Sequence, residues 1–110
     1  MEISTKEMKR VSLVSVSGRV DSATAPDFEK ALQALIQANR PQIVVDLKGV
    51  DYMSSAGLRA LVSSLKAAKS SGGDLRLAQL SARARQVLEM AGLNTIFTTY
   101  DDLVEAVGSF

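Results

Sequence analysis

The apolar residues of this chain change their spacing several times, and this alternation limits the possible folds more than any other feature. Residues 11–20 read Val-Ser-Leu-Val-Ser-Val-Ser-Gly-Arg-Val, a partly alternating, β-branched run that favours a strand. Phe28, Leu32, Leu35 and Ile36 then recur at helical steps and form one apolar stripe. Strands that alternate with helices predict an α/β fold, with a mixed, largely parallel β-sheet and α-helices packed on it.

Residues that end or cap helices divide the rest of the chain into further helices and strands. Asn39-Arg40-Pro41 and Ser70-Ser71-Gly72-Gly73 end two helical patterns, and Ser81 offers a cap for a third. We therefore expect the order ββαβαβαβα in a single domain over residues 1–110. The strands are predicted at 2–7, 11–20, 42–47, 74–80 and 94–98, the helices around 28–36, 58–68, 84–91 and 103–107, and a loop at 48–54, with Thr99 and two aspartates opening the last helix.

Charge and composition remove several classes of function. Thirteen basic and 12 acidic side chains give a formal net charge of +1, which provides no electrostatic reason to bind nucleic acid or an anionic membrane. The chain has no Cys, which excludes disulfides and thiolate chemistry, and no His, which removes the usual general base near neutral pH. No apolar stretch approaches the roughly 20 residues that span a bilayer, so we expect a cytoplasmic protein.

Two segments are expected to carry function because they follow strands at the carboxyl edge of the sheet. One is residues 18–22, and the other is residues 49–58, which enter a helix. In the second segment Ser54 and Ser55 lie at a helix start, where a phosphate would be tolerated and would add about −1.5 to −2 charges. Serine is also a preferred N-cap worth about 1 kcal/mol, and from spacing alone this structural role is the favoured one.

Three aspartates permit a further interpretation. Asp21, Asp46 and Asp51 could meet near one group of loops and hold a hard cation through their oxygens. Aspartates at strand ends more often hydrogen-bond backbone groups, so we expect no metal site.

Residues 43–58 read Ile-Val-Val-Asp-Leu-Lys-Gly-Val-Asp-Tyr-Met-Ser-Ser-Ala-Gly-Leu and resemble the signature of STAS domains of the anti-sigma factor antagonist family. In that family a strand ends in Asp-Leu, and a loop leads to Met-Asp-Ser-Ser/Thr-Gly-Leu at a helix start. Gly18-Arg19-Val20-Asp21 resembles the family's Gly-x-x-Asp after its second strand, and Ala91-Gly92-Leu93 resembles part of its C-terminal portion. The similarity covers essentially the whole chain.

The resemblance places the family's phosphoacceptor serine on Ser55. Met53, Gly57 and Leu58 match the residues around it. The chain departs from the family at Ser54, where the family has Asp, and at Ala56, which replaces a second Ser/Thr. The first departure leaves Ser54 as a rival acceptor.

The function that the resemblance implies is a partner switch in transcription regulation, with no bound cofactor and no enzymatic activity. The unphosphorylated domain would bind a serine-kinase anti-sigma factor, phosphorylation of Ser55 would release it, and a serine phosphatase would reset the cycle. The expected partner-binding residues are Asp21, Ser22, Met53, Ser54, Ser55, Gly57 and Leu58.

Two other functions stay open at this stage. The chain could be a STAS scaffold or regulatory subunit that is never phosphorylated, for example of a lipid-transport ATPase or a signalling complex. An enzyme is the weaker alternative. Without His or Cys, a serine nucleophile would need an activated Lys or carboxylate, and the sequence has neither a nucleophile elbow nor a phosphate-binding glycine loop.

Overall fold

The secondary structure follows the predicted order ββαβαβαβα in the computed structural model, which describes residues 1–110. The strands are β1 Glu2–Met8, β2 Val11–Val20, β3 Gln42–Met53, β4 Asp74–Ala78 and β5 Thr99–Tyr100. The helices are α1 Ala25–Gln37, α2 Ser55–Ser70, α3 Ala82–Met90 and α4 Leu103–Gly108. The predicted α/β class is confirmed.

The five strands form one mixed sheet in the order β1-β2-β3-β4-β5. β1 and β2 are antiparallel and joined by a tight turn, with Met8 opposite Val11. The other three pairs are parallel. Neighbours in the sheet are therefore always neighbours in the chain, and the prediction of a largely parallel sheet holds.

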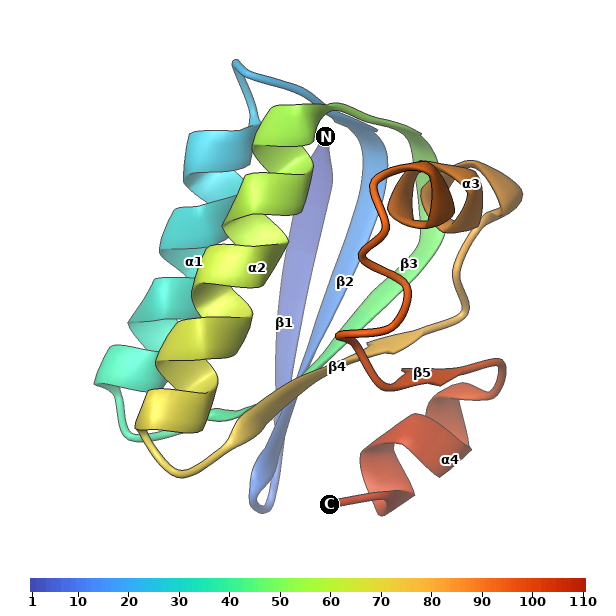
Figure 1. Cartoon of the computed structure of the whole chain (residues 1–110). Helices are drawn as coiled ribbons and strands as arrows, with labels where there is room; N and C mark the ends of the chain where they lie inside the picture. The colour runs from blue at the N-terminus through green and yellow to red at the C-terminus, as the bar shows by residue number, and fades with distance from the viewer.

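Helices α1, α2 and α3 cover one face of the sheet, and α4 packs on the other face (Figure 1). The main core lies under the first three helices, and the side chains fully enclosed there include Phe28 and Leu32 of α1 and Leu61 of α2. A smaller cluster around Val44 and Ala106 lies beneath α4. None of the four helices is long and apolar enough to cross a membrane.

The loop predicted at residues 48–54 is wrong, because β3 continues through Met53. Val50 and Met53 point into the core, with 2% and 3% of their surface exposed, and they pair with the end of β2. The pairing of β2 with β3 shifts register twice along this stretch. Such irregularities break the strict alternation from which a strand is recognised in a sequence, so this half of β3 had no strand pattern.

The strand predicted at residues 94–98 is also wrong. β5 is only Thr99–Tyr100, so Thr99 belongs to the sheet and does not open α4. β4, predicted to reach residue 80, ends at Ala78, and β5 pairs in parallel with its last two residues, Leu77 and Ala78. Helix α4 instead begins after Asp102, whose carboxylate accepts from the Val104 N–H at 3.0 Å.

Candidate functional site

The two predicted functional segments lie side by side at one edge of the sheet. The backbone N–H of Ser54 donates to the carbonyl of Val20 at 2.8 Å, so the start of α2 is joined to the end of β2. Ser22 and Ala56 line the same depression of about 310 Å³ between α1 and α2. The structure therefore places the segment containing Asp21 and Ser22 next to the start of α2, and both can contact one partner.

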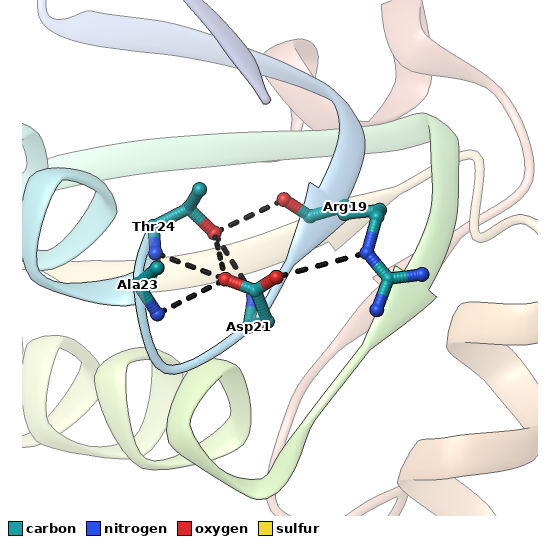
Figure 2. A network of polar contacts seen from close by, with 4 residues as sticks. All are labelled: Arg19, Asp21, Ala23 and Thr24. Atoms are coloured by element: carbon teal, nitrogen blue, oxygen red, sulfur yellow. Dashed lines mark hydrogen bonds and ion pairs between the residues drawn. The ribbon is translucent and has the colours of Figure 1, made fainter.

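The Asp21 segment is held in shape by its own hydrogen bonds, as Figure 2 shows. The Oδ1 atom of Asp21 accepts from the backbone N–H groups of Ala23 and Thr24 at 3.0 and 3.1 Å. In return, the Asp21 N–H donates to Thr24 Oγ1 at 2.9 Å, and this hydroxyl lies 3.0 Å from the Arg19 carbonyl oxygen. Asp21 thus fixes the turn that leads into α1, with Ser22 exposed at its tip.

The charge of Asp21 is favoured in the folded protein. The hydrogen bond from the Thr24 backbone N–H lowers the pKa of this carboxyl below its usual value of 3.8, and the Ala23 N–H and the nearby Arg19 guanidinium act in the same direction. Arg19 Nε lies 3.6 Å from Asp21 Oδ2, and its guanidinium stacks 4.1 Å from the ring centre of Tyr52 on β3. These contacts connect the segment to the strand that precedes α2.

The serine at the start of α2 does not act as a side-chain cap. Ser54 occupies the N-cap position, but its hydroxyl accepts no hydrogen bond from the helix and is buried without any partner. Ser81, the equivalent residue of α3, does cap: its Oγ accepts from the Ala84 N–H at 3.1 Å and donates to the Val50 carbonyl at 2.7 Å. The capping role, which spacing alone favoured for Ser54, is therefore absent from α2.

Ser55 is the first residue of α2, and it is exposed. Gly57 packs closely on the sheet: a Cβ at this position would lie 2.8 Å from a methyl of Val20 and 3.0 Å from Met53 Cγ. Met53, Gly57 and Leu58 are buried. They support the start of α2 from the core side, whereas Ser55 and Ser22 are at the surface.

An open groove of about 650 Å³ begins at Ser55 and runs along α2. Its apolar lining consists of Leu58 and Val62 from α2 and Leu93 from the segment after α3. Its polar lining consists of Ser55, Arg59, Ser63 and Lys66. Arg59 and Lys66 were not among the predicted site residues, although the spacing 55, 59, 62, 63 and 66 marks a single helix face.

The carboxylates of the chain are not gathered into a group that could hold a metal ion. No group of three or more His, Cys, Asp or Glu side chains is placed to share a cation, so Asp21, Asp46 and Asp51 do not converge. Asp46 accepts from the Lys48 backbone N–H at 3.0 Å, the local role expected of such residues. Open parallel sheets bind ligands where the strand order reverses, and this sheet has no such reversal.

The whole chain is similar to proteins of one regulatory family. A model of the STAS domain matches residues 2–106. The proposed anti-sigma factor antagonist BtrV of Bordetella bronchiseptica is 30% identical over 110 residues, covering 100% of this chain and 95% of that protein. The anti-sigma-B factor antagonist of Staphylococcus aureus is 31% identical over 96 residues, covering 87% of this chain and 89% of that protein.

Solved structures agree with this match. An anti-sigma factor antagonist from Mycobacterium paratuberculosis superposes with a TM-score of 0.88 at 29% identity, covering 98% of this chain and 92% of that one. The unphosphorylated form of the anti-sigma factor antagonist SpoIIAA shares the fold, with a TM-score of 0.86 at 15% identity over 98% and 95% of the two chains. SpoIIAA from Bacillus has also been solved in its phosphorylated form, which superposes with a TM-score of 0.79 over 98% of each chain.

Proposed function

Because the chain belongs to the STAS domain family, and relatives along its whole length are named anti-sigma factor antagonists, we propose that it is an anti-sigma factor antagonist controlled by phosphorylation of Ser55. In this proposal the unphosphorylated domain binds a serine-kinase anti-sigma factor in the cytoplasm and so releases a sigma factor. It acts as a regulator and not as an enzyme.

The observation that carries the proposal is the contrast between the two serines at the start of α2. Ser55 is exposed at the end of a groove, next to the Asp21 segment, where a kinase could reach its hydroxyl. The hydroxyl of Ser54 is buried. Exposure therefore supports Ser55 over Ser54 as the acceptor, and the free N–H groups of the first helical turn suit an anion at that position.

The phosphoryl transfer needs only a hydroxyl from this chain. Ser55 Oγ would attack the γ-phosphorus of ATP, a new P–O bond would form, and the bond to the β-phosphate oxygen would break to release ADP. A base on the kinase would take the hydroxyl proton. The product would carry about −1.5 to −2 charges on a surface that had none at this residue, and this charge would oppose rebinding.

The partner surface in this proposal is built from the Asp21 segment and the start of α2. Ser22 and Ser55 would contact the anti-sigma factor, with Leu58 at the edge of the groove. Met53 and Gly57 would support the surface from inside. A serine phosphatase would hydrolyse the phosphoester and return the domain to its binding state.

The direct test is intact mass spectrometry after incubation with ATP and lysate of the source organism, followed by fragment mapping. We expect one added phosphate on Ser55, absent in Ser55→Ala and retained in Ser54→Ala, the matched control. A lysate that phosphorylates a control antagonist but leaves this chain unmodified would refute the proposal.

A second candidate keeps the fold without the modification. Ser54 replaces the family's Asp beside the acceptor, and its hydroxyl makes no hydrogen bond that would explain its presence. In that case the same surface would be a constitutive interface of a scaffold or regulatory subunit. Binding of one partner by both the parent protein and Ser55→Asp, with equal affinity, would favour this candidate.

A further inference from the structure

Arg59 is a cation without a partner in the unmodified protein. Five of the other six arginines make a hydrogen bond, an ion pair or an aromatic contact: Arg19, Arg40, Arg76, Arg83 and Arg85. Arg10, in the turn between β1 and β2, makes none, but it lies far along the chain from α2. Arg59 also makes none of these contacts, and it is exposed on the face of α2 that carries Ser55. Its guanidinium is therefore available for a group that the unmodified chain lacks.

The helix geometry brings Arg59 to Ser55. The two residues are four apart in α2, so their side chains are neighbours on one face, with a rise of about 6 Å between them. Long side chains in a helix lean toward its N-terminus, so the side chain of Arg59 is expected to cover the turn that begins at Ser55. Both residues line the groove along α2, and Arg59 also borders the depression that Ser22 lines.

The groove is cationic before modification. Arg59 and Lys66 are its only charged residues, and none of its lining residues is acidic. The depression between α1 and α2 has one acidic lining residue, Glu29 of α1, and Arg59 makes no ion pair with it. A groove with an apolar floor and two cations fits a protein segment that presents apolar and acidic side chains together.

We propose that Arg59 is the internal counter-charge for the phosphoryl group on Ser55, so that phosphorylation removes the cationic end of this groove as well as adding an anion. A phosphoserine carries about −1.5 to −2 charges, which exceeds the single positive charge of Arg59 at this end of the groove. An acidic partner segment then loses its attraction to Arg59 and meets a negative group beside it. This inference rests on the proposed function for its biological role, but its test needs no kinase.

The test uses protein in which phosphoserine is incorporated at position 55 during synthesis, titrated by phosphorus NMR. A nearby cation stabilises the dianion and so lowers the second pKa of the phosphate, ordinarily about 6. We expect Arg59→Gln to raise this pKa by about 0.2–0.4 units at 0.1 M salt, the size of an i,i+4 ion pair. Arg59→Lys, which keeps the charge, should stay within about 0.1 units of the parent protein.

Lys66→Gln is the matched control in the same groove. Lys66 lies eleven residues after Ser55, about 16 Å along the helix axis, which exceeds the screening length of roughly 10 Å at 0.1 M salt. Its removal should shift the pKa by less than about 0.1 units. Equal shifts in Arg59→Gln and Lys66→Gln, or no shift in either, would overturn the pairing. Absence of kinase modification at Ser55 would instead count against the proposed function alone.

Discussion

Replacing Ser64 by Ala should make this protein more stable. Ser64 lies in the middle of α2 with 0% of its surface exposed, and its hydroxyl has no hydrogen-bond partner. An unsatisfied buried hydroxyl costs about 1–3 kcal/mol, and Ala has a higher helix propensity than Ser by roughly 0.5 kcal/mol. The neighbouring Ser63 is exposed on the same helix, so Ser63→Ala gains only the propensity term and serves as the control.

The assay is urea unfolding of the parent protein and both variants, followed by circular dichroism. We expect Ser64→Ala to raise the free energy of unfolding by about 1.5–3.5 kcal/mol and Ser63→Ala by about 0.5 kcal/mol, with unchanged m-values. A gain for Ser64→Ala no larger than that for Ser63→Ala would refute the reasoning. It would mean that the Ser64 hydroxyl finds a partner in solution, such as the carbonyl one turn earlier in the helix.

Three further changes test other parts of the fold. Gly57→Ala should lower the free energy of unfolding by about 1–2 kcal/mol despite the better helix propensity of Ala, because the new Cβ would lie 2.8 Å from a Val20 methyl. Gly108→Ala is the control, because a Cβ there has no neighbour within 4 Å, and urea unfolding should show no loss of stability for it. Arg76→Ala removes two 2.7 Å hydrogen bonds to Ser109 and a stack on the Phe110 ring. Amide hydrogen exchange in α4, measured by mass spectrometry, should therefore become about tenfold faster. An unchanged exchange rate would contradict this anchoring of the C-terminal segment. The pKa of Asp21 in the folded protein is below its usual 3.8, so its stabilising effect is present above about pH 4 and is lost as the pH falls through the folded pKa. The difference in the free energy of unfolding between the parent and Asp21→Asn should therefore shrink in acid. A difference that does not change with pH would contradict this prediction.

The sequence was sufficient for the elements that have strong periodicity. Leu58, Leu61 and Leu65 repeat at helical steps and are buried in α2, and Ser81 begins α3 with the predicted cap. Strand β2 has its predicted limits because its β-branched residues end at a clear boundary. These local signals agree with the tertiary packing, and so the order of elements could be obtained without a structure.

Other features depend on partners that the sequence does not reveal. The second half of β3 is a strand because β2 lies beside it, and no local pattern in residues 48–53 indicates this. Residues 94–98 are not a strand, because the parallel pairing with β4 begins only at Thr99, opposite Leu77. The predicted positions of Ser55 and Asp21 at one edge followed from parallel topology. The lack of a partner for Arg59 is visible only once its neighbours in the folded protein are known.

The identical order of the strands in the sheet and in the chain bears on how the protein is made. No strand has to insert between two that are already paired, so each new strand can add to a partner that has already left the ribosome. The hairpin of β1 and β2 can form first, and each later helix and strand extends the sheet in the direction of synthesis. The last additions, β5 and α4, are also the shortest elements of their kinds, so the folding unit that forms last is expected to be the one that opens first.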